Sequence, residues 1–304
     1  YSQLESSAKD LNTFLLKIEE IKKLAIPENE EMFFGNLSIV ISKAARHISQ
    51  QAPIDYQNLY LLFSAIKDLP LKRNVKWFSL LYSAFHKGMK DSFRYIEFAD
   101  WWDLKNFAKE DFEKDKLPNG KEVMAIAEQA YITYAKHLLP KQTLHGETEF
   151  DKEKVQTFLP TLSQIVENYP QFQYPAYFNA KLLLALGEKE NMLGALLPFA
   201  KKKRNDFWVW EIMAEAFSSE PEKVFACYCK ALSCKSADEM LVNLRQKMAK
   251  MLIEKNQYNE ARTEIELLIN SRTQNGFRIP NEVSIWQSMD WYKIAVPSKS
   301  NITF

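Results

Sequence analysis

The sequence has little glycine, with 7 such residues in 304. Glycine supplies the positive φ angles of tight β-hairpins and the close backbone approach of phosphate-binding loops, so few of either are expected. The motifs GxGxxG, GxSxG and HExxH and the P-loop motif are missing from the sequence altogether. Because these common catalytic and nucleotide-binding motifs are absent, we expect a protein that is not an enzyme and that carries no cofactor.

Cysteine is also scarce, and its three residues, Cys227, Cys229 and Cys234, lie within eight positions on one expected helix. An odd number at this spacing is unlike the disulfide framework of a secreted protein, so we expect a reducing, cytoplasmic environment. A structural zinc site needs four ligands, whereas a helix places Cys229 about 200° around its axis from Cys227. We therefore expect reduced cysteines and no bound metal.

The sequence has no excess of charge of one sign and no long apolar run. Its formal net charge is +1, so no global field draws it to nucleic acid or to an anionic membrane. The apolar runs are shorter than the roughly 20 residues that a membrane-spanning helix needs, and we expect no signal peptide at Tyr1. We expect no membrane partner. Because the sequence starts at Tyr1 and not at Met, we also expect a piece of a longer chain.

Helix-forming residues and helical periodicity are abundant instead, which predicts an all-α protein of about 12–15 helices. In the first half, helices are expected over residues 9–25, 30–48, 53–70, 75–89, 121–139 and 152–169. The stretch 91–120 is expected to be irregular, with its aromatic residues folded back onto the helices. Pro160 and Pro198 fall inside helical patterns, so a kink is expected at each.

Residues 176–269 form three imperfect helix–turn–helix units with tetratricopeptide spacing. They align as AKLLLALGEKENM, WEIMAEAFSSEPEKVFACYCKAL and KMAKMLIEKNQYNEARTEIELLI. In the third unit Asn256 takes the turn, and Ala261 lies where the two helices approach most closely. A single helical pair cannot bury its apolar face, so such units stack on their neighbours. The sequence thus predicts a right-handed, tetratricopeptide-like helical-repeat solenoid of antiparallel helix pairs.

We expect one continuous helical-repeat array over residues 1–304. The repeats are less regular in 1–150 and clearest in 176–269, and 270–304 is expected to be a capping segment.

Five stretches are more specific than a generic repeat: QYPAYFNAKLLLALGEKE, KKKRNDFWVWEIMAEAF, EPEKVFACYCKALSCK, LVNLRQKMAKMLI and RIPNEVSIWQSMDWY. With PENEEMFF, SKAARHI and DYQNLYLLFSAIKDLP, they resemble the uncharacterised bacterial tetratricopeptide-like proteins associated with predicted TOTE conflict systems. The resemblance implies a helical array with a role in conflict between hosts and mobile elements, and no catalytic residues. It also implies further helices before Tyr1 and a cold-shock- or S1-like β-barrel domain at the C-terminal side, which this sequence lacks.

The basic run 201–204 provides a candidate binding surface. The candidate surface consists of this run, an aromatic residue that follows it and an arginine further along the chain: Lys201, Lys202, Lys203, Arg204, Trp208 and Arg245. Cations beside an aromatic ring can hold a phosphate backbone and stack on bases. The same pattern is typical of a cation-rich helix C-terminus followed by a tryptophan in the packing position of the repeat, and we favour this second interpretation.

The function expected from these features is a scaffold that binds a protein or peptide partner on the concave surface of the solenoid. The alternative is an accessory nucleic-acid-associated protein that uses the basic run 201–204 and the missing β-barrel domain. The β-barrel domain would make the main contact, so we expect nucleic-acid binding by this chain to be weak. The acidic stretch 100–115 could attract a cation, but it lacks the ligand spacing of an EF-hand.

Overall fold

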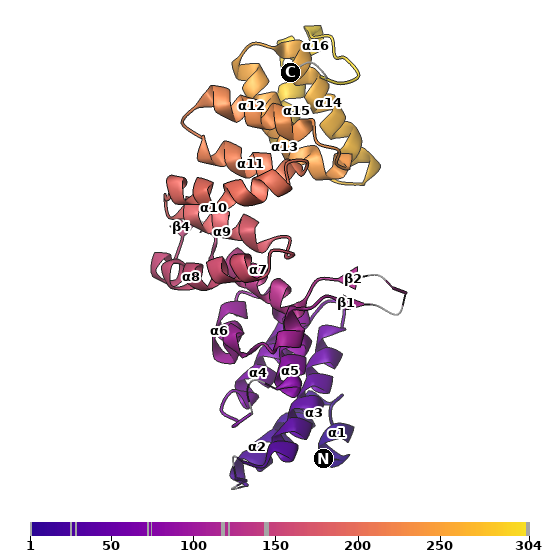
Figure 1. Cartoon of the computed structure of the whole chain (residues 1–304). Coiled ribbons are helices and arrows are strands. Elements are labelled where there is room, and N and C mark those ends of the chain that lie inside the picture. The colour runs from indigo at the N-terminus through magenta and orange to yellow at the C-terminus, as the bar shows by residue number, and fades with distance from the viewer. Residues whose placement is uncertain are drawn as a thin grey trace. The chain divides into compact units, whose positions relative to one another are not determined.

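The computed structural model describes residues 2–24, 26–27, 29–71, 73, 75–116, 119–120, 122–142 and 146–301. In these residues the chain forms sixteen α-helices, two short 3-10 helices and two ribbons of two-residue strands (Figure 1). The predicted all-α class is confirmed. The count exceeds the expected 12–15 because short helices such as α1 and α16, of five residues each, lie outside long periodic patterns. The chain divides into two compact units, residues 1–178 and 179–304, which are described separately.

Unit 1 opens with helices close to those expected from the sequence. They are α1 (Ser2–Ser6), α2 (Leu11–Lys23), α3 (Glu31–Ser49), α4 (Tyr56–Ile66) and α5 (Lys76–Met89). Helices α3 and α5 pack along each other. They approach so closely at Gly88 that an added Cβ atom would lie 2.4 Å from the Ser49 hydroxyl oxygen and 2.6 Å from a methyl carbon of Leu59. The missing side chain of Gly88 therefore sets the separation of these helices.

The second part of unit 1 contains the segments that the sequence described least well. They are α6 (Tyr95–Trp102), η1 (Leu104–Asn106), η2 (Lys109–Phe112), β1 (Asp115–Lys116), β2 (Glu122–Val123), α7 (Ile126–Leu138), β3 (Lys141–Gln142), β4 (Thr148–Glu149) and α8 (Lys152–Asn168). The stretch 91–120, which was expected to be irregular, thus contains the helix α6. Trp102 of this helix is fully buried and stacks on Phe78 with ring centroids 5.0 Å apart, in agreement with the expected return of the aromatic residues to the core.

Helix α7 begins at Ile126, five residues later than expected. Glu122–Val123 pairs instead with Asp115–Lys116 in an antiparallel ribbon. Gly120, in the expected turn between these strands, has a φ of 79°, the left-handed conformation that glycine adopts without steric cost. Helix α8 continues through Pro160 without a break in its helical assignment.

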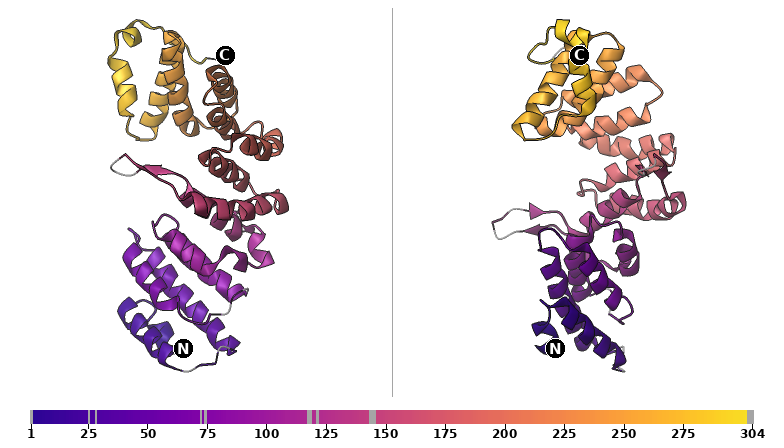
Figure 2. Two further views of the ribbon diagram at one scale, coloured as in Figure 1. Left: turned by 90° about the vertical axis from the view of Figure 1, so that its left-hand side faces the viewer. Right: turned by 180° about the vertical axis from the view of Figure 1, so that it is seen from behind.

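Unit 2 begins within α9 and consists of helices joined by short turns. The helices are α9 (Pro175–Ala185), α10 (Lys189–Lys202), α11 (Phe207–Ala216), α12 (Pro221–Leu232), α13 (Asp238–Glu254), α14 (Tyr258–Gln274), α15 (Asn281–Ser288) and α16 (Asp290–Ile294). Helix α11 packs on α12 and α13 on α14, and each pair lies side by side in the views of Figure 2. These pairs correspond to the second and third units of the predicted repeat.

The turn between α13 and α14 has the features expected from the sequence. Asn256 has a φ of 58°, so the residue expected to take the turn is in the left-handed conformation. Ala261 is fully buried and packs in one cluster with Met248 and Leu252 of α13. The small side chain of Ala261 therefore lies between α13 and α14.

Candidate functional site

The basic run 201–204 lies at the end of α10. Lys201 and Lys202 form the last turn of the helix and are exposed, as is Arg204, whereas Lys203 is half-buried. The ammonium nitrogen of Lys203 lies 3.7 Å from a carboxylate oxygen of Asp206. Cations at a helix C-terminus are stabilised by the helix dipole, which explains this run without a ligand.

The aromatic residues after this run take part in the packing of α10 and α11. Trp208 is half-buried, and its ring centroid lies 5.5 Å from that of Phe199 on α10. The indole Nε1 of Trp210 donates a hydrogen bond of 2.9 Å to the carbonyl oxygen of Arg204. Both tryptophans thus contribute to the junction between the two helices.

Arg245 differs from the other candidate residues because its charge is compensated inside unit 2. Its Nη1 donates a hydrogen bond of 2.7 Å to Glu264, and its Nη2 donates one of 3.1 Å to Asp238. Only 12% of the Arg245 side chain is exposed, and 2% of that of Glu264. Arg245 therefore connects α13 to α14 and does not extend an exposed basic surface.

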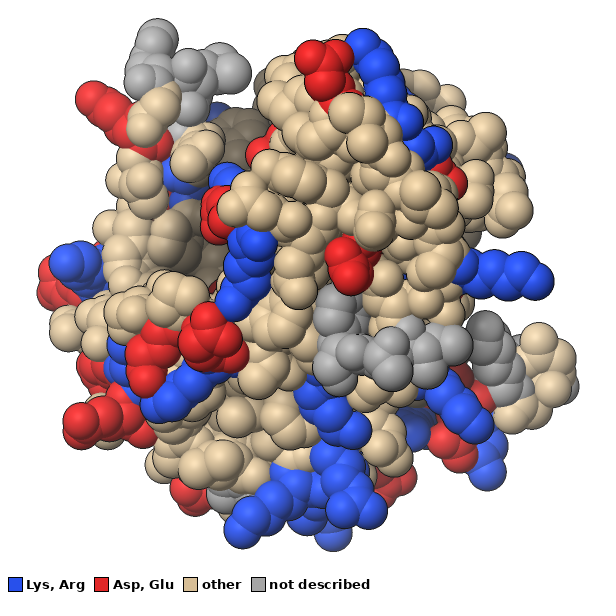
Figure 3. All heavy atoms as spheres, turned by 90° about the horizontal axis from the view of Figure 1, so that it is seen from above, with Lys and Arg blue, Asp and Glu red and all other residues tan. Residues whose placement is uncertain are grey.

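The surface charges are of both signs. On the face in Figure 3, basic and acidic side chains are interspersed among uncharged ones, and one small group of basic side chains lies at the lower edge. Interspersed charges of opposite sign weaken the field of a surface relative to that of a continuous basic groove.

The three cysteines lie on or just after α12. Cys227 and Cys234 are buried and Cys229 is half-buried. Burial raises the pKa of the Cys229 thiol to about 11, so this group stays protonated near neutral pH. Within the described part of the chain, no three His, Cys, Asp or Glu side chains are grouped so that they could hold a metal ion.

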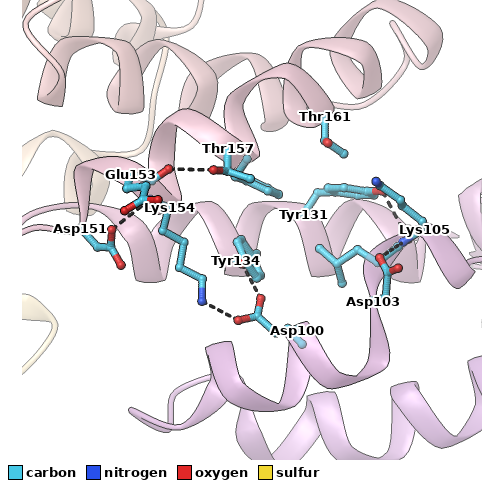
Figure 4. Close-up of a pocket in the computed structure, with 13 residues that line it drawn as sticks. Asp100, Asp103, Lys105, Tyr131, Tyr134, Asp151, Glu153, Lys154, Thr157 and Thr161 are labelled. Carbon is cyan, nitrogen blue, oxygen red and sulfur yellow. Dashed lines mark hydrogen bonds and ion pairs between the residues drawn. The ribbon is translucent and has the colours of Figure 1, made fainter.

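A different candidate site is an open pocket of about 470 Å³ in unit 1, which we call the acidic pocket (Figure 4). Its walls come from α6, η1, α7 and α8. The charged lining residues are four carboxylates and two lysines: Asp100, Asp103, Asp151, Glu153, Lys105 and Lys154. The formal net charge of this lining is therefore −2, although the net charge of the whole chain is +1.

Asp100 has two side-chain partners in the acidic pocket. Its carboxylate accepts a hydrogen bond of 2.6 Å from the hydroxyl group of Tyr134 and forms an ion pair of 2.5 Å with the ammonium group of Lys154 (Figure 4). Burial and the hydrogen bond to Asp100 raise the pKa of Tyr134 far above its usual value, so the phenol remains a donor at all physiological pH values. These contacts fix the Asp100 carboxylate between α7 and α8.

Aromatic rings form the apolar part of the acidic pocket. Tyr131, Tyr134 and Phe158 all line it and are buried to more than nine-tenths of their surface. The ring centroid of Phe158 lies 4.5 Å from that of Tyr134 and 6.3 Å from that of Tyr131. The pocket thus combines an aromatic floor with an acidic rim.

Local backbone features place the rim residues. Asp103 has a φ of 58°, which a non-glycine residue seldom adopts, and it marks the sharp change of direction between α6 and η1. Its carboxylate accepts a hydrogen bond from the backbone N–H of Lys105 at 3.1 Å. On the opposite wall, Asp151 caps α8 by accepting the backbone N–H of Lys154 at 2.9 Å. Capping therefore holds two of the four carboxylates at the rim.

The sequence indicated only one wall of this pocket. The sequence marks the acidic stretch 100–115 as a possible cation site, but it gives no sign that Tyr131, Tyr134 and Lys154 lie beside it. Asp100 and Lys154 are 54 residues apart, and no local pattern predicts that they meet. The one available signal was the spacing of Tyr131 and Tyr134, which places both rings on one face of a helix.

A further feature is the segment 295–301, which follows α16 and which we call the C-terminal strap. The side-chain oxygen of Asn259 on α14 accepts the backbone N–H of Val296 at 2.7 Å. One turn further along α14, the Thr263 hydroxyl oxygen accepts the backbone N–H of Ser298 at 3.0 Å. The amide of Asn301 then donates to Glu264 at 3.0 Å. The strap is therefore held to α14 largely through its backbone.

Comparison with known proteins gives one match. A protein family described as "Domain of unknown function (DUF7017)" matches residues 173–304, a range that contains all of unit 2. A search of curated proteins and a search of solved structures each gave no match. Among the described residues, none of the helices has both the length and the apolar character needed to cross a membrane.

Proposed function

We propose that this protein is a non-enzymatic helical-repeat scaffold that binds a protein or peptide partner. Its setting is the cytoplasm of a bacterium, in a conflict or defence system, as its resemblance to the tetratricopeptide-like proteins of such systems implies. A helical array of this kind acts by presenting side chains of successive helices along an extended surface.

The contacts between alternate helices of unit 2 support the tetratricopeptide-like solenoid in this proposal. Lys181 of α9 pairs with Glu215 of α11 at 2.6 Å, and Glu211 of α11 pairs with Lys247 of α13 at 3.0 Å. Gln246 of α13 donates to Glu282 of α15 at 2.8 Å. In a stack of helix pairs, the first helices of successive repeats are neighbours, which is the relation that these contacts require.

The observation that carries the proposal is the way in which α14 holds the C-terminal strap. Asn259 and Thr263 are four residues apart, a rise of about 6 Å along a helix. Val296 and Ser298 are two residues apart, a rise of about 6.6 Å in an extended chain. The spacing of the two helical side chains matches the spacing of the two backbone N–H groups. Polar residues at every fourth position of a helix can therefore accept hydrogen bonds from every second backbone N–H group of an extended peptide. Pro297, which has no N–H, occupies the position between them.

Such backbone contacts depend little on the sequence of the bound segment, and they supply affinity in many peptide-binding proteins. The contacts of the strap support the proposal, because they are of the type by which a helical face can hold an extended partner. The partner that we propose is a protein segment that is extended or disordered before it binds.

A selection experiment tests this proposal. The full chain, immobilised, is used to select from a random library of displayed 12-residue peptides. We expect enrichment of specific sequences whose binding is competed by the same soluble peptide and not by its scrambled form. Failure of any sequence to enrich, or binding that scrambled peptides compete equally well, would contradict the scaffold function.

The alternative function, an accessory role at nucleic acid, is favoured by the exposed side chains of Lys201, Lys202 and Arg204. The packing of Trp208 on Phe199 opposes it, because a ring engaged in packing is less able to stack on bases. We therefore rank nucleic acid second among the partners of this chain.

A further inference from the structure

We propose that the acidic pocket binds the guanidinium group of an arginine side chain that the partner of the scaffold presents. This inference rests on the proposed function, since it names the side chain by which a peptide partner is recognised. It assigns a ligand to unit 1, whereas the strap contacts lie in unit 2.

The size and lining of the acidic pocket suit an amphipathic side chain with a cationic end. Its volume of about 470 Å³ falls within the range of about 300–1,000 Å³ that is usual for ligand pockets. An aromatic floor of Tyr131, Tyr134 and Phe158 covers the apolar stem of such a side chain, and the carboxylates of the rim compensate its charge. A neutral or anionic group would leave the net charge of −2 uncompensated.

The pocket already holds one cation of this chain. The ammonium group of Lys154 is paired with Asp100, on the oxygen opposite to the one that accepts the Tyr134 hydroxyl. Asp100 and Asp103 lie on the wall that α6 and η1 form, whereas Asp151 and Glu153 lie at the start of α8 on the opposite wall (Figure 4). A second cation that enters between these walls would therefore meet carboxylates on both sides.

The distribution of the carboxylates distinguishes between kinds of cation. A metal ion needs several ligands that converge on one point, whereas no such group exists among the described residues. A guanidinium group is planar, carries five N–H donors spread around its edge, and stacks on aromatic rings. Carboxylates spread around a rim above tyrosine rings match this shape better than they match a metal ion or a compact ammonium group.

A free small molecule with a guanidinium group has the same chemistry as an arginine side chain of a peptide. The first experiment therefore compares these two kinds of ligand. The full chain is titrated with N-acetyl-arginine amide, with N-acetyl-citrulline amide and with agmatine, and binding is followed by saturation-transfer NMR. Citrulline has the shape of arginine without its charge. We expect the arginine derivative to bind and the citrulline derivative to bind at least about fivefold more weakly. Equal binding of the two, or no binding of the arginine derivative, would overturn the proposal.

Matched variants locate the binding. Asp100→Asn and Asp103→Asn each remove one charge from the pocket with little change of shape, and both should weaken binding of the arginine derivative about three- to tenfold. Glu167→Gln removes one exposed charge from α8 outside the pocket and should leave binding unchanged. An equal effect of all three variants would assign the binding to general electrostatics and overturn the proposal. Circular dichroism spectra and melting curves establish that each variant is folded.

The second experiment uses the peptides selected on the full chain. Each arginine of the tightest peptide is replaced in turn by citrulline. One of these replacements should weaken binding of the peptide to the parent protein about tenfold. It should weaken binding to Asp100→Asn and to Asp103→Asn far less, because the citrulline replacement and the pocket substitution remove the same contact. Selected peptides whose affinity is insensitive to both pocket variants would overturn the pocket inference and leave the scaffold function standing. If agmatine binds in the pocket and no arginine-containing peptide does, the site belongs to a free small cation, and the pocket inference is overturned as well.

Discussion

Arg245 and Glu264 form an ion pair of 2.7 Å in the interior of unit 2, between α13 and α14. Glu264 is almost completely removed from solvent, and it also accepts a hydrogen bond from Asn301 of the C-terminal strap. One buried carboxylate thus connects the helix pair α13–α14 with the segment that follows α16. Removing one member of a buried pair leaves the charge of the other without compensation.

We therefore expect Glu264→Gln to lower the free energy of unfolding by about 3 kcal/mol, the lower end of the usual range because Asp238 remains as a partner of Arg245. Urea denaturation followed by circular dichroism measures the change. Glu254→Gln, which removes an exposed carboxylate at the end of α13, is the control and should be neutral within about 0.5 kcal/mol. Equal stabilities of the two variants would show that the pair contributes nothing.

Gly88→Ala tests the close approach of α3 and α5. The added methyl group would overlap Ser49 and Leu59, so we expect a loss of about 1–3 kcal/mol in stability. The control is Gly194→Ala in α10, where nothing lies within 4 Å of an added Cβ atom. That change should stabilise the helix by about 0.5–1 kcal/mol, because alanine has the higher helix propensity. If the melting temperatures of both variants shift in the same direction, the close approach of α3 and α5 at Gly88 is contradicted.

Ala261→Leu tests the register of the third repeat unit. The larger side chain must fit into the filled space beside Met248 and Leu252, and we expect a cost of about 1–3 kcal/mol. Ala226→Leu, at an exposed position of α12, is the matched control and should change little. A melting temperature of Ala261→Leu equal to that of the parent would show that the repeat register is wrong.

His86 is expected to make the stability of unit 1 depend on pH. Burial lowers the pKa of His86 to about 4, and its Nδ1 lies 3.1 Å from the Tyr95 hydroxyl oxygen. In the unfolded chain this imidazole takes up a proton near its usual pKa of about 6.5. As the pH falls from about 6.5 to 4, the unfolded state therefore binds a proton that the folded state does not, and stability decreases by on the order of 3 kcal/mol.

Urea denaturation at pH 7.5 and at pH 4.5 measures this dependence. The loss of stability between the two pH values should be smaller in His86→Gln than in the parent, whatever the stability of the variant at pH 7.5. The same substitution at the half-buried His47 provides the comparison for a histidine outside this cluster. If the parent and His86→Gln lose stability equally, His86 is not the source of the pH dependence.

The basic run 201–204 distinguishes the two candidate functions. We expect this chain to bind labelled single- or double-stranded oligonucleotides only weakly at physiological salt in a fluorescence-anisotropy titration, because its net charge is +1. Charge reversal at Lys201, Lys202 and Lys203 should leave the circular dichroism spectrum unchanged. Submicromolar binding that this triple reversal abolishes would favour the nucleic-acid function over the scaffold.

The helical class and the interior of unit 2 could be predicted from the sequence because both depend on local periodicity. The spacing of Ala249, Ala261 and Leu268 places them on the inner faces of α13 and α14, where all three are fully buried. Helix α6 was missed although its buried residues Tyr95, Phe98, Ala99 and Trp102 have helical spacing, because the helix is only eight residues long and lies in a stretch rich in acidic and aromatic residues. The late start of α7 was missed because strand pairing competed with helix formation over residues 122–123.

The sequence by itself determined that the chain is helical, where most helices begin and end, and which small residues lie inside the helix pairs of unit 2. These properties follow from the preferences of neighbouring residues along the chain. Only the tertiary structure decided that Asp100 meets Lys154 and Tyr134 in one pocket, and that Arg245 is paired with Glu264 instead of facing solvent. Such contacts join side chains that are distant in the sequence, and they form only when packing of the apolar faces brings their helices together.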